Sequence, residues 1–153
     1  MSPHLDRVSN AEFGRRRSIL GREMKERALD AVLIFGTFQG WQNVFYFANH
    51  WDLVSCFLVI PAASDPVLIT GVYPHLSSIR DVSVIRDVRF GGGGVVDLIA
   101  SILKGRGATA GGLVLITETG ALFRRIAGVR QLSDCARRLG AEIGADDPRG
   151  GAS

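Results

Sequence analysis

Residues 41–52 concentrate side chains whose chemistry suits ligand binding. The segment, WQNVFYFANHWD, combines five aromatic rings with two Asn, one His and one Asp. Such a mixture is costly to bury unless each polar group has a hydrogen-bond partner. The segment therefore indicates either a cluster that faces a ligand or an aromatic minicore with His residues at its rim.

A predicted hairpin would bring this segment next to further ligand-binding groups. Residues 53–60 and 67–70 have the apolar character of strands, and the Pro-containing link 61–66 is typical of a turn. With the turn at the middle of this link, Asp52 faces His75, and the rings and imidazoles meet at one end of the sheet. The residues expected to gather there are His50, Trp51, Asp52, Tyr73 and His75.

No complete catalytic or metal-binding set is visible in the sequence. The three His are scattered, with no His-x-x-x-His or Cys-x-x-Cys spacing. Asp87 and Asp97 have a spacing reminiscent of paired metal ligands, but no later His or Glu pair completes a site. No Gly-x-Ser-x-Gly motif occurs, and Cys56 lies in an apolar run, as a core thiol does. We therefore predict no catalytic residue, no metal site and no cofactor in this chain.

Two further motifs have simpler explanations than ligand binding. The glycine run 91–94 lies between a predicted strand and a predicted helix, where backbone amides could hold a phosphate. It lacks the Gly-Lys-Ser/Thr ending and the correctly spaced third glycine of nucleotide-binding loops, so a flexible loop is favoured. The basic run Arg15–Arg17 lies on the first predicted helix with glutamates nearby, which favours a solvated face. The net charge is only +3, and we predict no nucleic-acid binding.

The composition is that of one globular domain, which must position these side chains. The chain has 153 residues, of which 46% are apolar and 22% charged, and this length buries a substantial core. The longest charge-free run, 53–64, is far shorter than the ~20 residues that span a bilayer. The N-terminus has no basic segment leading into an apolar stretch. We expect no membrane segment, no secretory signal and a cytoplasmic location.

Apolar spacing predicts an α/β domain over residues 1–140, with a mixed sheet of about five strands and helices on its faces. The glycine-rich stretch 141–153 is expected to be a disordered tail. The predicted helices cover 10–28, 95–104 and 118–139, and the predicted strands cover 31–35, 53–60, 67–70, 82–88 and 113–116.

Four segments, taken in order, resemble the N-terminal domain of the creatinase/prolidase family. This is the accessory domain that precedes the metal-binding pita-bread domain in aminopeptidase P, prolidase and creatinase-like proteins. Order and spacing agree over residues 12–116, although Ala28 stands where the family often has Gly and Ala48 where it often has Thr or Ser. The matching segments are 24–34 (MKERALDAVLI), 43–49 (NVFYFAN), 57–61 (FLVIP) and 66–70 (PVLIT).

The resemblance implies a three-layer α/β/α fold of the ribonuclease-H-like kind. In that family the N-terminal domain holds no metal ligand, so a divalent metal would belong to the C-terminal catalytic domain. The N-terminal domain helps to form the dimer and borders the substrate cleft, often that of the neighbouring subunit. The family's Asn-x-x-Tyr match carries over to Asn43 and Tyr46, which we therefore expect at the cleft.

The expected function is that of a non-catalytic accessory domain of a metal-dependent Xaa-Pro peptidase or creatinase-like hydrolase. The expected partners are a second copy of the chain, in a homodimer, and a missing or separate pita-bread catalytic domain. The alternative is a free-standing domain that binds a small molecule at the aromatic and His-containing end of the hairpin. The sequence is compatible with a fragment, an altered gene product or a stand-alone protein.

Overall fold

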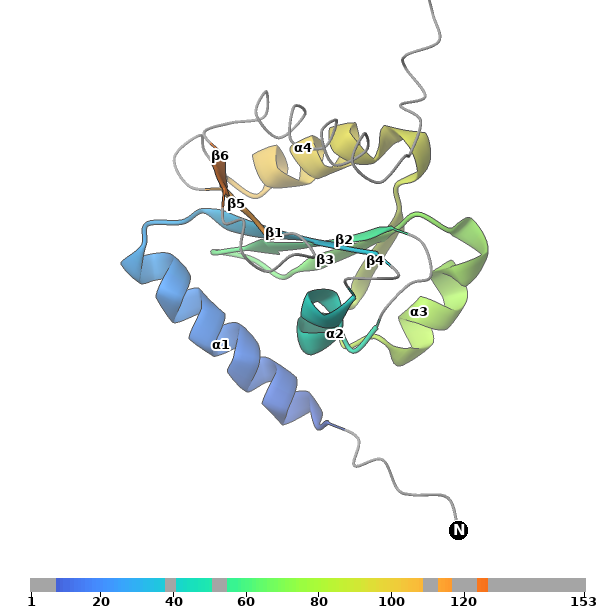
Figure 1. Ribbon diagram of the computed structural model, residues 1–153, viewed down its shortest axis with the longest axis horizontal. Helices are drawn as coiled ribbons and strands as arrows, with labels where there is room; N and C mark the ends of the chain where they lie inside the picture. Colours follow the sequence, from blue (N-terminus) through green and yellow to red (C-terminus); the bar gives the residue numbers. More distant parts are fainter. Residues whose placement is uncertain (1–7, 38–40, 51–54, 109–112, 117–123, 127–153) are drawn as a thin grey trace, which may run out of the picture.

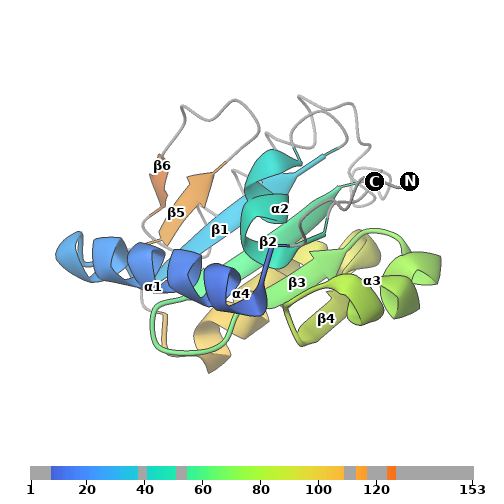
Figure 2. The ribbon, with the colours of Figure 1, turned by 90° about the horizontal axis from the view of Figure 1, so that it is seen from below.

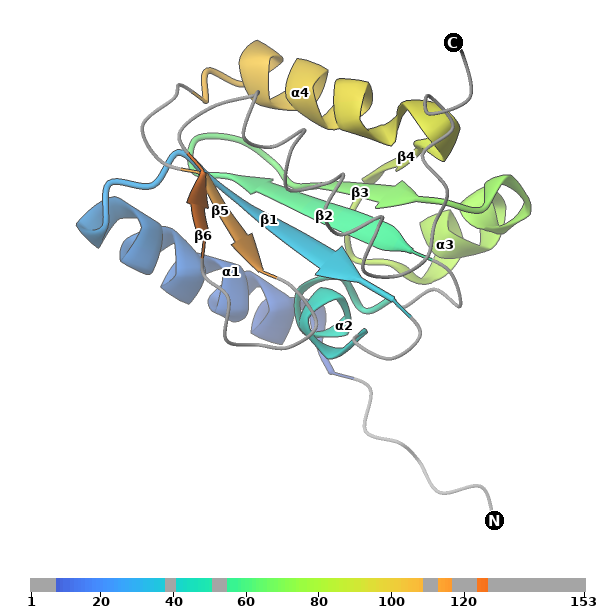
Figure 3. The same cartoon turned by 45° about the horizontal axis from the view of Figure 1, so that its top comes forward.

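The structure, a computed structural model, describes residues 8–37, 41–50, 55–108, 113–116 and 124–126. Within these residues, six strands form one mixed sheet in the order β4-β3-β2-β1-β5-β6 (Figures 1 and 3). The strands are β1 Ala31–Gly36, β2 Cys56–Pro61, β3 Val67–Thr70, β4 Asp87–Phe90, β5 Leu113–Ile116 and β6 Arg124–Ile126.

Helices cover both faces of this sheet (Figures 1 and 2). Three of them lie on one face and α4 lies on the other, which confirms the predicted α/β class with a mixed sheet. Among the described residues, no helix has the length and apolar character needed to cross a membrane. The helices are α1 Asn10–Glu26, α2 Gln42–Ala48, α3 Leu76–Val82 and α4 Val95–Gly105, and the 3-10 helices η1 Tyr73–His75 and η2 Gly92–Gly94 precede α3 and α4.

The centre of the sheet is an antiparallel meander that parallel strands extend on both sides. β1 pairs with β2, and β2 with β3, in antiparallel orientation. β4 lies parallel to β3, β5 lies parallel to β1, and β6 pairs antiparallel with β5. A parallel neighbour requires a crossover connection, and α3 lies within the one that joins β3 to β4.

Two hydrophobic clusters, one on each face, fix the buried strands. Successive residues of a strand point to opposite faces. Odd-numbered residues such as Leu33 and Phe57 therefore share a cluster with Ile99 of α4. Even-numbered residues such as Leu58 share the other cluster with Val44 of α2 and with residues of α1 and α3. Both helical layers are needed to keep the sheet away from water.

Some predicted elements are confirmed and others are wrong. The strands 67–70 and 113–116 have their predicted bounds, and α1 and α4 end within two residues of theirs. The described sheet has six strands because residues 124–126 form β6, where the spacing predicts a helix over 118–139. The rest of that helix and the tail 141–153 lie outside the described residues. The domain boundary at residue 140 stays a prediction.

Two helices are absent from the sequence prediction. α3 ends at Val82, where the predicted strand 82–88 begins, and the observed strand β4 covers residues 87–90 instead. A signal for α3 exists: Pro74 at its approach is followed by apolar residues at the helical spacing 76, 79 and 82. α2 is only seven residues long, and its buried Val44 and Ala48 are spaced i, i+4 within the aromatic segment.

The hairpin of β2 and β3 differs from its predicted register by one residue. Phe57 pairs with Ile69, whereas Asp52 opposite His75 would require Phe57 opposite Thr70. Among the described residues the paired positions extend to Cys56 and Thr70, after which the chain continues from β3 into η1 and α3. The predicted register is therefore wrong by one residue. Trp51 and Asp52 lie outside the described residues, and the gathering of His50, Trp51, Asp52, Tyr73 and His75 stays a prediction. The alternative small-molecule site at that hairpin end likewise stays a prediction.

The C-terminal end of α1 is a Schellman motif whose left-handed residue is Ala28. The Leu29 N–H donates to the Met24 carbonyl (2.8 Å), and the Ala28 N–H donates to the Lys25 carbonyl (3.2 Å). Ala28 has a φ of 51°, a conformation that favours glycine because it crowds a Cβ. The alanine that stands where the creatinase/prolidase family often has Gly thus occupies a strained position.

Replacing Ala28 by Gly is expected to raise the free energy of unfolding by about 0.5–1 kcal/mol. Relief of the left-handed strain exceeds the flexibility that glycine adds to the unfolded chain. Urea unfolding of the wild type and A28G, followed by circular dichroism, measures the difference.

The matched control is the opposite exchange on the same helix. Apart from its chain neighbours and the backbone of its own helix, no atom lies within 4 Å of a Cβ built on Gly21, so G21A is also expected to stabilise by about 0.5–1 kcal/mol. Stabilisation by G21A together with destabilisation by A28G would contradict the left-handed conformation at residue 28.

Candidate functional site

Five of the six candidate cleft residues lie in or beside two separate helical segments. Three belong to or closely follow α2, two lie in η1 and one lies outside the described residues. In that order they are Asn43, Tyr46 and His50, then Tyr73 and His75, and finally Trp51. The α2 group stays together along the chain, but no strand pairing among the described residues joins it to the η1 group. A position of these residues at a substrate cleft stays a prediction.

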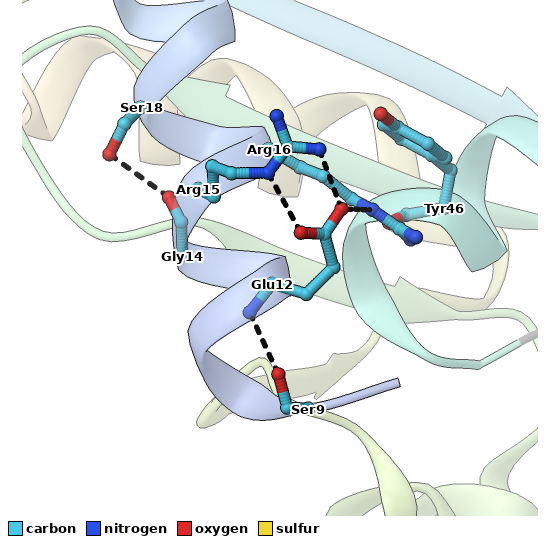
Figure 4. Close-up of polar contacts among 7 residues, drawn as sticks. All are labelled: Ser9, Glu12, Gly14, Arg15, Arg16, Ser18 and Tyr46. Carbon is cyan, nitrogen blue, oxygen red and sulfur yellow. Dashed lines mark hydrogen bonds and ion pairs between the residues drawn. The ribbon is translucent and has the colours of Figure 1, made fainter. Parts of the chain in front are cut away.

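An arginine of α1 holds Tyr46 in place (Figure 4). The Arg16 Nη1 donates a hydrogen bond to the Tyr46 carbonyl (2.9 Å). The Arg16 guanidinium carbon also lies 4.1 Å from the centre of the Tyr46 ring and 5.1 Å from that of Phe13, within the range of cation–π attraction. The Arg16 side chain is only 15% exposed, while Tyr46 stays 44% exposed. The contact fixes α2 against α1 and leaves part of the tyrosine at the surface.

Glu12 completes this junction by pairing with two arginines (Figure 4). Its carboxylate accepts hydrogen bonds from Arg15 (2.8 Å at each oxygen) and from Arg16 (3.1 Å). Its backbone N–H donates to the Ser9 hydroxyl (3.2 Å), which caps α1. The hydrogen bonds from Arg15 and then Arg16 lower the pKa of Glu12 to about 2. The basic run is therefore only partly a solvated face, because Arg16 joins two helices.

A cleft of about 850 Å³ lies between α1 and the residues at the end of α3. Hydrogen bonds tie α2 to one side of it: the Ser83 hydroxyl donates to the Ala48 carbonyl (2.8 Å), and the Asn49 side-chain amide donates to the Val82 carbonyl (3.3 Å). Asn49 has a φ of 53°, which Asn tolerates better than most residues. The charged lining residues are Arg17, Arg80, Asp81 and Arg86, and we call this site the arginine cleft.

The arginine cleft has no signature in the sequence. The sequence pattern predicts Arg17 on a solvated helix face, and neither Arg80 nor Arg86 belongs to a motif. These residues meet only because α1 and α3 cover the same face of the sheet (Figure 1). Tertiary packing, not local spacing, creates the site.

Tyr73 forms an exposed aromatic pair with Phe90, the last residue of β4. The ring centroids lie 5.4 Å apart at 79°, and the two residues are 67% and 42% exposed. The glycine run begins at the next residue. A Cβ on Gly91 would lie 2.8 Å from both Ile69 and Val95, and Gly92 has a φ of 51°. Close packing and backbone conformation therefore explain the first two glycines of the run.

Asp87, one of the two aspartates whose spacing resembles that of paired metal ligands, binds arginines instead. Asp87 accepts hydrogen bonds from Arg89 (2.9 Å at each oxygen) and Arg106 (3.2 Å), and the hydrogen bond from Arg89 lowers the pKa of Asp87. Asp97 lies in the first turn of α4. In the part of the chain that the structure describes, no group of three or more His, Cys, Asp or Glu could hold a metal ion. The absence of a metal and of catalytic residues stays a prediction for the whole chain.

Solved structures of Xaa-Pro peptidases share this fold. An Xaa-Pro aminopeptidase from Streptococcus pyogenes matches 90% of this chain and 89% of its own, with a TM-score of 0.59 and 16% identity. The Xaa-Pro dipeptidase from Bacillus anthracis matches 80% of this chain with a TM-score of 0.58 and 16% identity, but only 31% of its own chain is covered. The N-terminal domain of the cytoplasmic peptidase PepQ from Mycobacterium tuberculosis H37Rv matches 80% of this chain and 85% of its own, with a TM-score of 0.56 and 20% identity.

These comparisons define the fold of the chain. No protein-family model and no curated protein matches the sequence. The chain nonetheless has a creatinase/prolidase-like N-terminal domain fold, as the matches to Xaa-Pro peptidases and to the separate PepQ domain show. The resemblance inferred from the four sequence segments is thereby confirmed at the level of the fold.

Acid is expected to weaken the junction between α1 and α2 through Glu12. The folded protein holds the pKa of Glu12 at about 2, below its ordinary 4.5, so the stabilisation is complete above pH 4.5 and is lost as the pH falls towards 2. E12Q should lose less stability than the wild type across this interval in urea unfolding.

E23Q is the matched control, because Glu23 lies on the same helix and its pair with Arg27 is exposed and longer (3.4 Å). NMR titration of the Glu12 side-chain carboxyl carbon gives the pKa directly. A Glu12 midpoint near its ordinary value, or equal pH dependence in the wild type and E12Q, would contradict the charge pairing in Figure 4.

Proposed function

We propose that the chain is a non-catalytic N-terminal accessory domain of a metal-dependent Xaa-Pro peptidase or creatinase-like hydrolase. The observation that carries this proposal is the fold match to the separately solved N-terminal domain of PepQ, 85% of which is covered. The same chain covers only 31% of the Xaa-Pro dipeptidase from Bacillus anthracis. In the proposed role, a pita-bread domain supplies the divalent metal and the catalytic residues, and the parent protein acts in the cytoplasm.

The proposal includes a ribonuclease-H-like strand arrangement and a place for α2 in the wall of the substrate cleft. The antiparallel meander β1–β2–β3 with parallel neighbours supports the first part. For the second, Tyr46 offers a partly exposed ring that Arg16 holds in a fixed position. Asn43, three residues earlier on the same helix, is half-buried and would supply an amide beside that ring.

We also propose that the chain forms a homodimer, because several large apolar side chains stay at the surface. Such groups favour association when they are buried against a partner. The exposed ones among the described residues are Val8, Ile19, Tyr46, Tyr73, Val82 and Phe90.

Sedimentation velocity over a range of concentrations is expected to show a monomer–dimer equilibrium. Burial of the apolar surface drives association. Y73S removes the most exposed of these rings and tests whether Tyr73 lies in the dimer contact. A single monomeric species at the highest concentration would contradict the proposed dimer.

The purified chain is expected not to hydrolyse Xaa-Pro dipeptides or creatine, even with added manganese, cobalt or zinc. Metal-dependent hydrolysis needs protein ligands around an ion with an open position, and the described residues provide no group of three or more such ligands. A colorimetric assay for released proline or sarcosine measures turnover. Chelator-sensitive turnover by the isolated chain would contradict a non-catalytic role, and a metal-ligand domain encoded directly downstream would support the accessory role.

A further inference from the structure

The arginine cleft gathers more positive charge than its surroundings neutralise. Three guanidinium groups line it, from α1, from α3 and from the segment before β4, and Asp81 is the single acidic residue among the described lining residues. Like charges that share a site repel one another, and an anion placed between them is correspondingly favoured. The balance of charge therefore points to a negatively charged occupant.

The guanidinium groups have unused hydrogen-bonding capacity. The Arg80 Nη2 donates to the Val88 carbonyl (3.1 Å), a contact that fixes the side chain and leaves its other nitrogens available. The Arg17 Nε is buried and has no hydrogen-bond partner, an arrangement that is costly for a donor. The Arg17 side chain thus has unused donor capacity beside the cleft.

The remaining lining residues favour a small molecule with both polar and apolar parts. Asn10 and Asn49 add amide groups to the lining. Val8 and Val82, which are 38% and 55% exposed, add apolar surface to the same cleft. The cleft thus combines charged donors with a wall suited to hydrocarbon.

We propose that the arginine cleft binds an oxyanion, either a carboxylate or a phosphate, carried by a partly apolar small molecule. The planar guanidinium presents paired N–H donors that match the two oxygens of either group, and Arg17 and Arg86 supply such donors from two separate segments. This site is distinct from the α2 surface of the proposed cleft wall, and its failure would leave the proposed accessory role unaffected.

Isothermal titration calorimetry of the full chain tests the proposal with two probes, inorganic phosphate and N-acetyl-L-valine, at constant ionic strength. At least one probe is expected to bind saturably. R17Q and R86Q are each expected to weaken that binding about tenfold or more, because each removes a charged hydrogen-bond donor. Preference for phosphate or for N-acetyl-L-valine identifies which oxyanion the cleft takes.

R22Q is the matched control, since Arg22 is an exposed arginine on α1 that does not line the cleft. It should bind both probes as the wild type does. Arg86 is exposed, so R86Q keeps the test valid even if R17Q disturbs folding. Binding of neither probe, or equal weakening by R22Q, would overturn the proposal, as would amide NMR shifts that map away from Asn49 and Val82.

Discussion

A sheet buried on both faces is the constraint on which the rest of this molecule depends. Every residue of β1, β2 and β3 is buried, so neither face of the central meander is exposed to solvent. Burying one aliphatic side chain contributes about 1.5–3 kcal/mol, and that gain is available only if helices cover both sides. α4 covers one side, and α1, α2 and α3 share the other (Figure 1).

The shared side is where the candidate functional surfaces arise. α2 is too short to be a stable helix by itself, and it depends on the burial of Val44 and Ala48 and on hydrogen bonds near its C-terminal end. Arg16 holds it to α1 through the Tyr46 carbonyl, and Ser83 holds it to the end of α3 through the Ala48 carbonyl. These ties leave Tyr46 partly exposed and form one side of the arginine cleft. Both surfaces are consequences of covering one face with three separate helices.

The sequence was sufficient to predict the central strands β1, β2 and β3 but not the register of their pairing, and it displaced β4 and missed β6. Continuous apolar runs bounded by turn residues mark β1 and β3 clearly. The same runs lack the alternation of apolar and polar residues that would reveal register, because both faces are buried. Phe57 opposite Ile69 and Phe57 opposite Thr70 therefore look alike in sequence, and only the shared clusters of the folded protein distinguish them. The arginine cleft was unpredictable for a related reason, since its residues meet only through helix packing.

The pairing of β2 with β3 is the feature that most directly supports this account, because it fixes the end of the hairpin at which η1 and α3 follow β3. Interstrand backbone proton contacts from NMR spectroscopy of the labelled chain measure it. The account predicts contacts between Phe57 and Ile69 and between Leu58 and Leu68, as the observed register requires. Contacts between Phe57 and Thr70 would contradict it and would support the register predicted from the sequence instead.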